Sequence, residues 1–247
     1  MRINTFLVRS MPVLVAQLCM MAASSAQPVD SGFFDDYSRL APTEATGLDY
    51  MYTRPGWEEV VRETRTVVIP QPEIFLAPDS KYKGMKPDDM KALADAIRSG
   101  MFVALADGFQ IADNPGPNTI VIRVALTNMY IKKKGRIPLI GYLPPAYIAG
   151  SVKRKWLNDF AKNILLTEAV VEMEILHSES GEILGQLVAE LGDREVAEGF
   201  ASWEDLQAAT MVAGLRLRCR LDNAKFEPEL RVNCLEAITL DDIASDD

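Results

Sequence analysis

Residues 119–131 carry the pattern that most restricts what this chain can fold into. Ile120, Ile122, Val124 and Leu126 alternate there with Val121, Arg123, Ala125 and Thr127. A period of two over so many residues predicts a β-strand with one wholly apolar face. Such a strand requires partner strands beside it and a cover over its apolar face. The chain is therefore expected to build a sheet with helices packed on it.

A second strand and its hairpin partner are predicted nearby. Over 166–177, Ala169, Val171, Met173 and Ile175 share one face, and Glu168, Glu172 and Glu174 share the other. We interpret the glutamates as the solvent face of a half-buried sheet; the alternative is a cation site. The sequence Ser178-Glu-Ser-Gly181 predicts a turn, and 182–190 returns as the hairpin partner.

The remaining elements follow from local signals. Residues 64–77 predict a strand that Pro70 and Pro72 confine to a sheet edge or a bulge. Helices are expected at about 87–106, where Pro87 suits the first turn, and at about 203–221, where Ser202 is the expected N-cap. Residues 27–63 show no sustained period but are too rich in aromatic side chains for a disordered linker, so we expect an ordered, irregular arm.

These elements predict an α+β fold. We expect a small antiparallel or mixed sheet of four or five strands with two helices packed on one side, in the order β-α-β-β-β-α. The domain organisation is then 1–26 as a signal peptide, 27–63 as the arm, 64–222 as the α+β domain, and 223–247 as a C-terminal extension with an acidic tail.

The first 26 residues have the composition of an export signal. Arg2 and Arg9 precede an apolar run of about 13 residues, shorter than the roughly 20 needed to span a bilayer, and small residues end at Ala26. We expect cleavage after Ala26, release into the periplasm of a Gram-negative bacterium and no transmembrane helix in the mature chain. Cys19 offers a lipid-anchor alternative, but Leu18 occupies the position where a small residue is required.

Net charge limits the classes of binding partner, and the cysteine content predicts a disulfide. Without its first 26 residues the chain has 24 basic and 35 acidic residues, a net charge of −11. This charge argues against nucleic-acid binding and against broad attraction to anionic lipid. Cys219 and Cys234 then remain as an even pair in an oxidising compartment, and we expect a structural disulfide that stabilises by roughly 3 kcal/mol.

Several phrases resemble the bacterial domain-of-unknown-function family 3313, whose members are described as envelope lipoproteins. The phrases are Gly32-Phe-Phe-Asp-Asp-Tyr-Ser-Arg-Leu40, Ile120-Val-Ile-Arg-Val-Ala-Leu-Thr-Asn128, Val171-Glu-Met-Glu-Ile175 with Ser180-Gly-Glu-Ile-Leu184, and Ser202-Trp-Glu-Asp-Leu206. The resemblance covers roughly residues 32–222. It implies an envelope location and brings no catalytic residues with it. The sequence departs from the family in lacking a proper lipidation box at Cys19.

No enzyme site can be assembled from motifs. His177, the one histidine of the chain, has no second imidazole to share a metal, and we interpret it as a turn residue. Ser80-Lys81-Tyr82-Lys83 has the SxxK spacing of penicillin-recognising enzymes, but the companion motifs are absent and the spacing is expected by chance. We therefore predict no catalytic residue, no metal and no cofactor.

The segment 132–156 is the strongest candidate for function. Lys132, Lys133, Lys134 and Arg136 precede an apolar stretch broken by Pro and Gly, and Lys153, Arg154 and Lys155 follow it. Long connections in compact domains are often functional. Our hypothesis is that Tyr142, Leu143, Tyr147 and Ile148 contact a partner protein or a membrane, with Lys133, Arg136, Lys153 and Arg154 on anionic groups. The alternative is that the segment folds back over the sheet.

Together these observations predict a non-catalytic accessory protein of the cell envelope that acts by protein contacts. The alternative is a carrier of a small apolar ligand, which a deep apolar cavity would support.

Overall fold

The computed structural model describes residues 28, 30–43, 48–80, 85–133, 164–191 and 203–234. The side chains of 131–133, 164–168, 190–191 and 203–209 are outside this description. The predicted signal segment and most of segment 132–156 also lie outside it. All structural statements below refer to the described residues.

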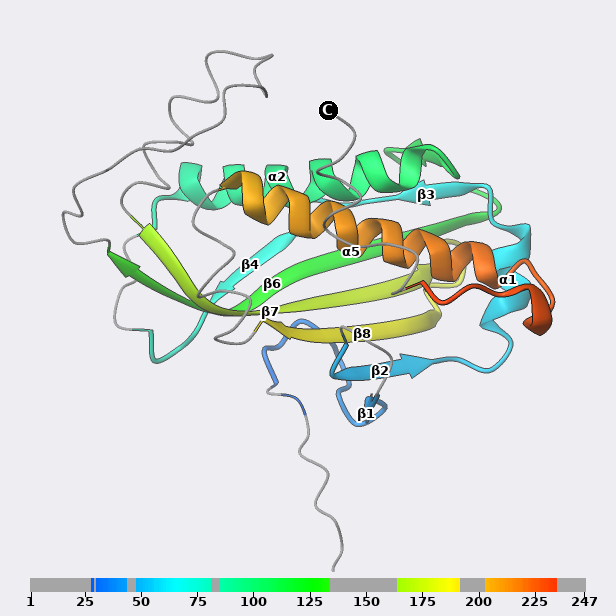
Figure 1. Ribbon diagram of the computed structural model, residues 1–247, viewed down its shortest axis with the longest axis horizontal. Coiled ribbons are helices and arrows are strands. Elements are labelled where there is room, and N and C mark those ends of the chain that lie inside the picture. The colour runs from blue at the N-terminus through cyan, green and yellow to red at the C-terminus, as the bar shows by residue number, and fades with distance from the viewer. Residues whose placement is uncertain are drawn as a thin grey trace, which may run out of the picture.

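A mixed eight-stranded sheet forms the centre of the fold (Figure 1). Its strands are β1 (Ala41–Pro42), β2 (Tyr50–Thr53), β3 (Thr66–Val68), β4 (Glu73–Leu76), β5 (Gln110–Ala112), β6 (Thr119–Lys133), β7 (Ile164–His177) and β8 (Ile183–Leu191). They lie in the order β1-β2-β8-β7-β6-β3-β5. Strand β4 lies outside this order and pairs with residues 125–129 of β6, whereas β3 pairs with residues 119–121 of the same strand. The strands β6, β7 and β8 are long and antiparallel, whereas β3, β4 and β5 add parallel pairs.

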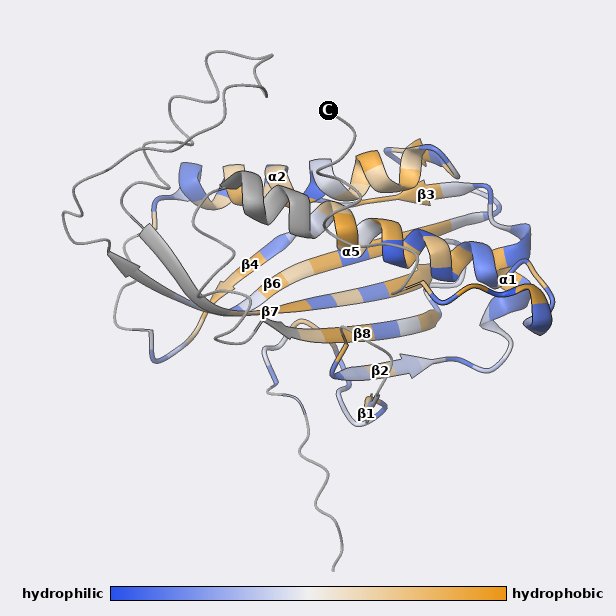
Figure 2. Cartoon of the chain, in the orientation of Figure 1, coloured by the Kyte–Doolittle hydropathy of each residue, from blue (hydrophilic) through white to orange (hydrophobic). Residues whose placement is uncertain are grey.

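Two helices cover one face of this sheet. Helix α2 (Pro87–Ala106) and helix α5 (Trp203–Asn223) run side by side over the central strands (Figure 1). Gly214 allows their close approach, because an added Cβ there would lie 2.7 Å from the Cβ of Ala104. The core between helices and sheet includes Leu93 and Met101 of α2 and Ile120 and Ile122 of β6, all at most 1% exposed. The strands show the matching alternation of apolar and polar bands (Figure 2).

The first part of the N-terminal arm, residues 30–40, covers the opposite face of the sheet. Its side chains Phe33, Phe34, Tyr37 and Leu40 are buried in a second apolar cluster with Ala125 and Val188. The molecule therefore has three layers, which are the helices, the sheet and the arm. The arm closes a face that would otherwise be open to water.

The predicted fold class was wrong in the size of the sheet. The structure has eight strands instead of four or five, and a third helix, α1 (Trp57–Glu63), in addition to the two that were predicted. The segment 27–63, which we expected to be irregular, contains β1, β2 and α1. Strands of two to four residues are too short to show a period, and only their pairing with neighbouring strands reveals them, as in the pairs β2–β8 and β3–β6.

Other predicted elements are present with small differences in length. Helix α2 has the predicted bounds, and the backbone N–H of Lys86 donates to Asp89 Oδ2 at 3.3 Å before its first turn. The predicted strand 64–77 is divided into β3 and β4, with Pro70 and Pro72 in the gap. Pro70 and Pro72 have no N–H to donate, which accounts for the interruption.

Candidate functional site

The predicted contact residues of segment 132–156 lie outside the described residues. These are Arg136, Tyr142, Leu143, Tyr147, Ile148, Lys153 and Arg154, while Lys133 is the last residue of β6 and its side chain is not described. The docking hypothesis for this segment therefore stays a prediction.

The other candidates from the sequence have local roles in the structure. His177 ends β7, where its Nδ1 lies 2.9 Å from Ser180 Oγ and accepts the backbone N–H of Ser180 at 3.3 Å. Ser80 is 4% exposed, and residues 81–83 of its SxxK spacing lie outside the description. Within the described part of the chain, no group of three or more His, Cys, Asp or Glu side chains could hold a metal ion.

The predicted disulfide is confirmed. Cys219 of α5 is bonded to Cys234, 15 positions further along the chain, with their Cα atoms 5.6 Å apart. The bond joins the last turns of α5 to Cys234, so the described part of the extension, residues 224–234, lies against the domain.

Glu172 and Glu174 are buried, which corrects their predicted place on a solvent face. They are 1% and 3% exposed, because the arm covers the face of β7 from which they project. Glu168, predicted on the same face, has no described side chain. Burial of a carboxyl group is costly unless hydrogen bonds compensate it, so the partners of these two groups decide what the face can do.

Glu172 is held by three hydroxyl groups. Tyr37 Oη and Ser31 Oγ of the arm donate to Glu172 Oε2 at 2.7 and 3.0 Å, and Thr127 Oγ1 of β6 donates to Oε1 at 2.8 Å. Burial raises the pKa of Tyr37 above its ordinary value; the hydrogen bond to Glu172 also raises it, whereas the one with Ser31 lowers it. Two of the three donors come from the arm, so this carboxyl group anchors the arm to the sheet.

Glu174 belongs to a second, ionic part of the same cluster. Arg123 of β6 donates to Glu174 Oε2 at 2.7 Å and to Glu73 Oε1 at 3.0 Å, and its guanidinium lies 4.7 Å from the ring centre of Phe33. Gln186 Nε2 donates to Glu174 Oε1 at 3.0 Å, while Gln186 Oε1 is buried and has no hydrogen-bond partner among the described residues. Both glutamates are thus occupied by structural contacts beneath the arm.

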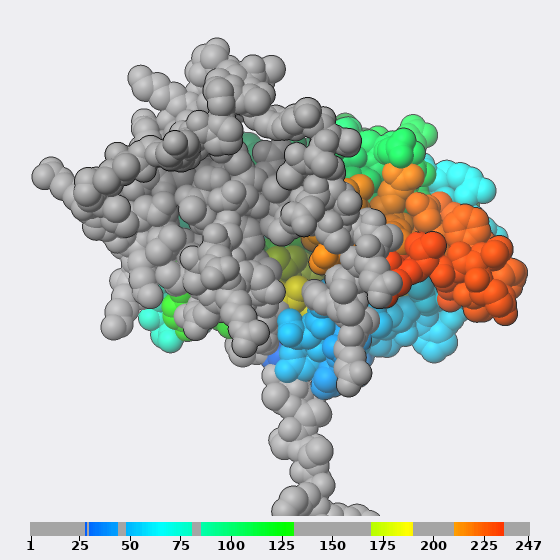
Figure 3. Space-filling view, viewed as in Figure 1, coloured from blue at the N-terminus to red at the C-terminus, as the bar shows by residue number. Residues whose placement is uncertain are grey.

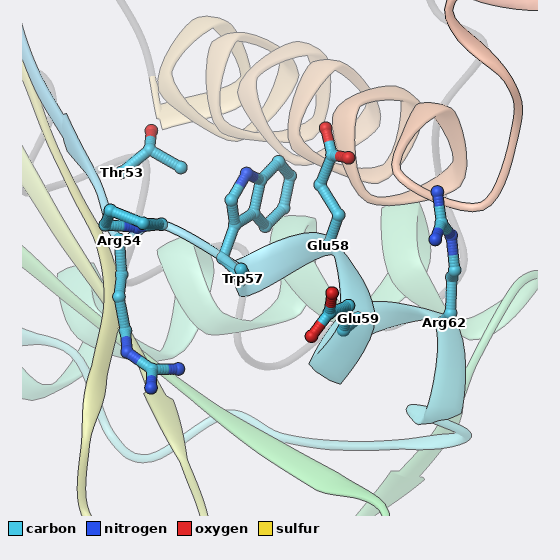
Figure 4. A pocket seen from close by; sticks show the side chains of 8 residues that line it. Thr53, Arg54, Trp57, Glu58, Glu59 and Arg62 are labelled. Carbon is cyan, nitrogen blue, oxygen red and sulfur yellow. The ribbon is translucent and has the colours of Figure 1, made fainter.

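A shallow hollow opens where β2 runs into α1 (Figure 4). It is lined by residues 53–59 and Arg62. The side chains of Trp57 and Glu58 point toward α5, whereas Arg54 and Glu59 point away from it (Figure 4). Arg54 Nε pairs with Glu182 at 2.8 Å. The lining is mainly polar and the hollow is open to solvent, so it lacks the character of a deep apolar cavity.

The C-terminal loop, residues 224–234, exposes a group of large apolar side chains. Phe226, Leu230 and Val232 are 49%, 68% and 55% exposed. The end of α5 and this loop form the orange-to-red surface at one end of the molecule (Figure 3). Three apolar side chains in seven residues differ from the single scattered ones normal on a surface. No sequence pattern singled them out, since 223–247 was expected only to be a C-terminal extension with an acidic tail.

The loop is rigidly attached on both sides. Besides the disulfide, Asn223 Nδ2 donates to the carbonyl of Val232 at 2.8 Å, and the Val232 N–H donates to Asn223 Oδ1 at 3.0 Å. Arg231 bridges to Glu58 of α1 at 2.8 Å, and Arg62 Nε donates to the carbonyl of Ala224 at 3.0 Å. The exposed apolar side chains are therefore presented on a fixed backbone.

Comparison with solved structures gives low overall similarity. A neuraminyllactose-binding hemagglutinin homologue from Helicobacter pylori is 10% identical, with a TM-score of 0.32 over 75% of this chain and 92% of that one. A PelC dodecamer structure from Paraburkholderia phytofirmans is 12% identical, with a TM-score of 0.29 over 67% and 93%. A DUF330 protein from Xanthomonas campestris is 11% identical, with a TM-score of 0.27 over 67% and 86%. At these scores the similarities support no argument about function.

Comparison of the sequence with protein families gives a clear result. None of the curated proteins matches the chain. The family model for proteins of unknown function DUF3313 matches residues 29–214, which include the arm, the whole sheet and most of α5. The chain therefore belongs to the DUF3313 family of proteins of unknown function.

Proposed function

We propose that this protein is a non-catalytic accessory protein of the Gram-negative periplasm that acts by contacts with another envelope protein. The expectation of export rests on the first 26 residues, with their basic start, short apolar run and small residues before Ala26. The expectation of a contact role rests on the surface of the domain.

The C-terminal loop is the observation that carries the proposal. A protein without a partner gains nothing from exposing Phe226, Leu230 and Val232 on a backbone fixed by a disulfide. Rigid presentation lowers the entropy that is lost when two surfaces associate. Aromatic side chains such as Phe226 are enriched in protein interfaces, whose buried core is more apolar than the rest of the surface.

The ionisable groups that the structure brings together support a non-catalytic role. Glu172 and Glu174 lie beneath the arm, where a substrate would have to displace Phe33 and Tyr37 to reach them. Arg54 and Glu58, in the hollow beside α1, are already engaged in ion pairs within the chain. Each of these groups has a structural contact that explains its position.

Within the part of the chain that the structure describes, the carrier alternative finds no comparable support. A carrier needs an apolar cavity that encloses most of its ligand, whereas the hollow beside α1 is open and lined mainly by polar groups.

Within the described residues, none of the helices combines the length and the apolar character needed to cross a bilayer.

Site-specific crosslinking in intact cells tests the proposal. A benzophenone amino acid at Leu230 is expected to give a discrete protein adduct, and one at Lys91, exposed near the start of α2, is expected to give none. The purified native chain is expected to begin at Gln27 by mass analysis. A chain that still began at Met1, or equal labelling from both positions, would count against the proposed function.

A further inference from the structure

We infer that the C-terminal loop binds a protein surface in which an apolar pocket is rimmed by lysine or arginine side chains. This inference rests on the proposed function and adds the chemistry of the partner. It follows from three properties of the loop: its apolar side chains, its fixed backbone and the sign of its free charges.

The apolar side chains belong to one compact loop. The loop turns through a short 3₁₀ helix, Pro228–Leu230, and Arg231 Nε then donates back to the carbonyl of Phe226 at 3.3 Å. This contact holds the two ends of the turn together. Phe226 and Leu230 consequently project from the same turn, and Val232 follows at its base beside Asn223. A pocket on a partner could receive these side chains without reorganising the loop.

The charges of the loop divide into paired cations and unpaired acids. Lys225 pairs with Asp222 at 3.0 Å and lies 4.3 Å from the ring centre of Phe109, and Arg231 pairs with Glu58 at 2.8 Å. Glu227 and Glu229 are exposed and have no ion pair within the described residues. The charges still free to meet a partner on the loop are therefore negative.

This arrangement favours a basic protein surface over the other occupants. Two free carboxylates beside the apolar side chains would be repelled by an anionic lipid surface. A second copy of this acidic chain would meet general charge repulsion, since each copy has a net charge of −11 without its first 26 residues. Lysine or arginine around an apolar pocket would complement both features, because complementary charges guide association and exclude wrong partners.

Charge reversal separates this inference from the proposed function. In the chain that carries the benzophenone at Leu230, Glu227→Lys with Glu229→Lys is expected to lower the adduct yield in intact cells by about ten-fold or more. The matched control, Asp35→Lys with Glu179→Lys, makes the same change in net charge at two exposed acids outside the loop and is expected to leave the yield unchanged. Melting temperatures of both purified variants equal to that of the chain without the charge reversals would show that neither has lost its fold.

The possible outcomes are distinct. Loss of the adduct in the loop variant alone, with basic residues around the crosslinked position of the captured protein, supports the inference. An adduct that survives the loop reversal overturns the basic rim but leaves the contact function standing. No protein adduct from Leu230 overturns both. An adduct to a second copy of the chain, or binding of the purified protein to phosphatidylglycerol vesicles that requires Leu230, also overturns the inference.

Discussion

Removing one hydroxyl group from the arm should measure how firmly the arm is anchored. In Tyr37→Phe the ring stays in the apolar cluster and only the oxygen is lost. That oxygen donates to Glu172 at 2.7 Å and is the acceptor for the backbone N–H groups of Phe33 and Phe34 at 3.3 and 3.4 Å. The substitution therefore tests the polar anchor separately from apolar packing.

The magnitude follows from the partner and its burial. Hydrogen bonds to charged groups contribute roughly 1.5–3 kcal/mol, and Glu172 is only 1% exposed, so water cannot replace the lost donor. Ser31 and Thr127 continue to donate to Glu172, which limits the loss. We expect the free energy of unfolding to fall by about 2 kcal/mol.

Urea denaturation with the disulfide intact provides the assay, and Tyr50→Phe is the matched control. Tyr50 packs against the same cluster of arm side chains, but its hydroxyl makes no hydrogen bond within the described residues. The control should change stability by less than about 0.5 kcal/mol. A double-mutant cycle of Tyr37→Phe with Glu172→Gln should give a coupling energy of about 1 kcal/mol or more. If the two tyrosine variants lost the same stability, the hydroxyl anchor would have to be abandoned.

Three further perturbations have definite expected results. Because burial raises the pKa of Tyr37, the unfolded chain loses the phenol proton at a lower pH than the folded chain does. The stability that the buried, protonated phenol contributes is therefore complete below about pH 10 and is lost as pH rises above it. Urea titrations at pH 8–11 should show a steeper fall in the free energy of unfolding for the wild type than for Tyr37→Phe. Replacing Cys219 and Cys234 by serine should lower the free energy of unfolding by about 3 kcal/mol, and a change below about 1 kcal/mol would contradict a stabilising staple. Gly214→Ala should cost about 1–3 kcal/mol by thermal melting, because its Cβ would lie 2.7 Å from that of Ala104; an unchanged melting temperature would show that α2 and α5 can separate freely.

Long periodic segments were predictable because their signals are local. Helix α2 has the predicted bounds and begins at Pro87, and β6, β7 and β8 follow from alternation and the turn at 178–181. The pairing of Cys219 with Cys234 followed from counting the cysteines. Each of these predictions needed only residues close together in the sequence, or a set too small to allow alternatives.

The extra strands could not be predicted in the same way. Strand β1 has two residues, β3 and β5 have three, and β2 and β4 have four. Strands of this length have no measurable period and exist because a neighbouring strand offers unpaired backbone groups beside them. β2 pairs along β8, and β3 pairs along β6, more than 50 positions away in sequence. Their positions therefore depend on tertiary contacts, which the local sequence pattern does not show.

The same limit explains why Glu172 and Glu174 of β7 were predicted to be exposed although they are buried. Alternation correctly separated them from the apolar face, but it cannot tell a solvated face from one that another segment covers. The donors to Glu172 from the arm lie 135 and 141 positions away. One signal was available, since the arm is too apolar to remain in solvent and also contains hydroxyl groups that a buried carboxyl requires.

Coverage of both sheet faces has a consequence for function. Helices α2 and α5 occupy one face and the arm the other, so in the described part of the chain neither face is left to a ligand. The partner contact that we propose must then use edges, loops or helix surfaces. The C-terminal loop is the place where exposed apolar side chains, a covalent staple and free carboxylates coincide. The loop is bonded to α5 and bridged to α1, so it can bind a partner without any rearrangement of the sheet.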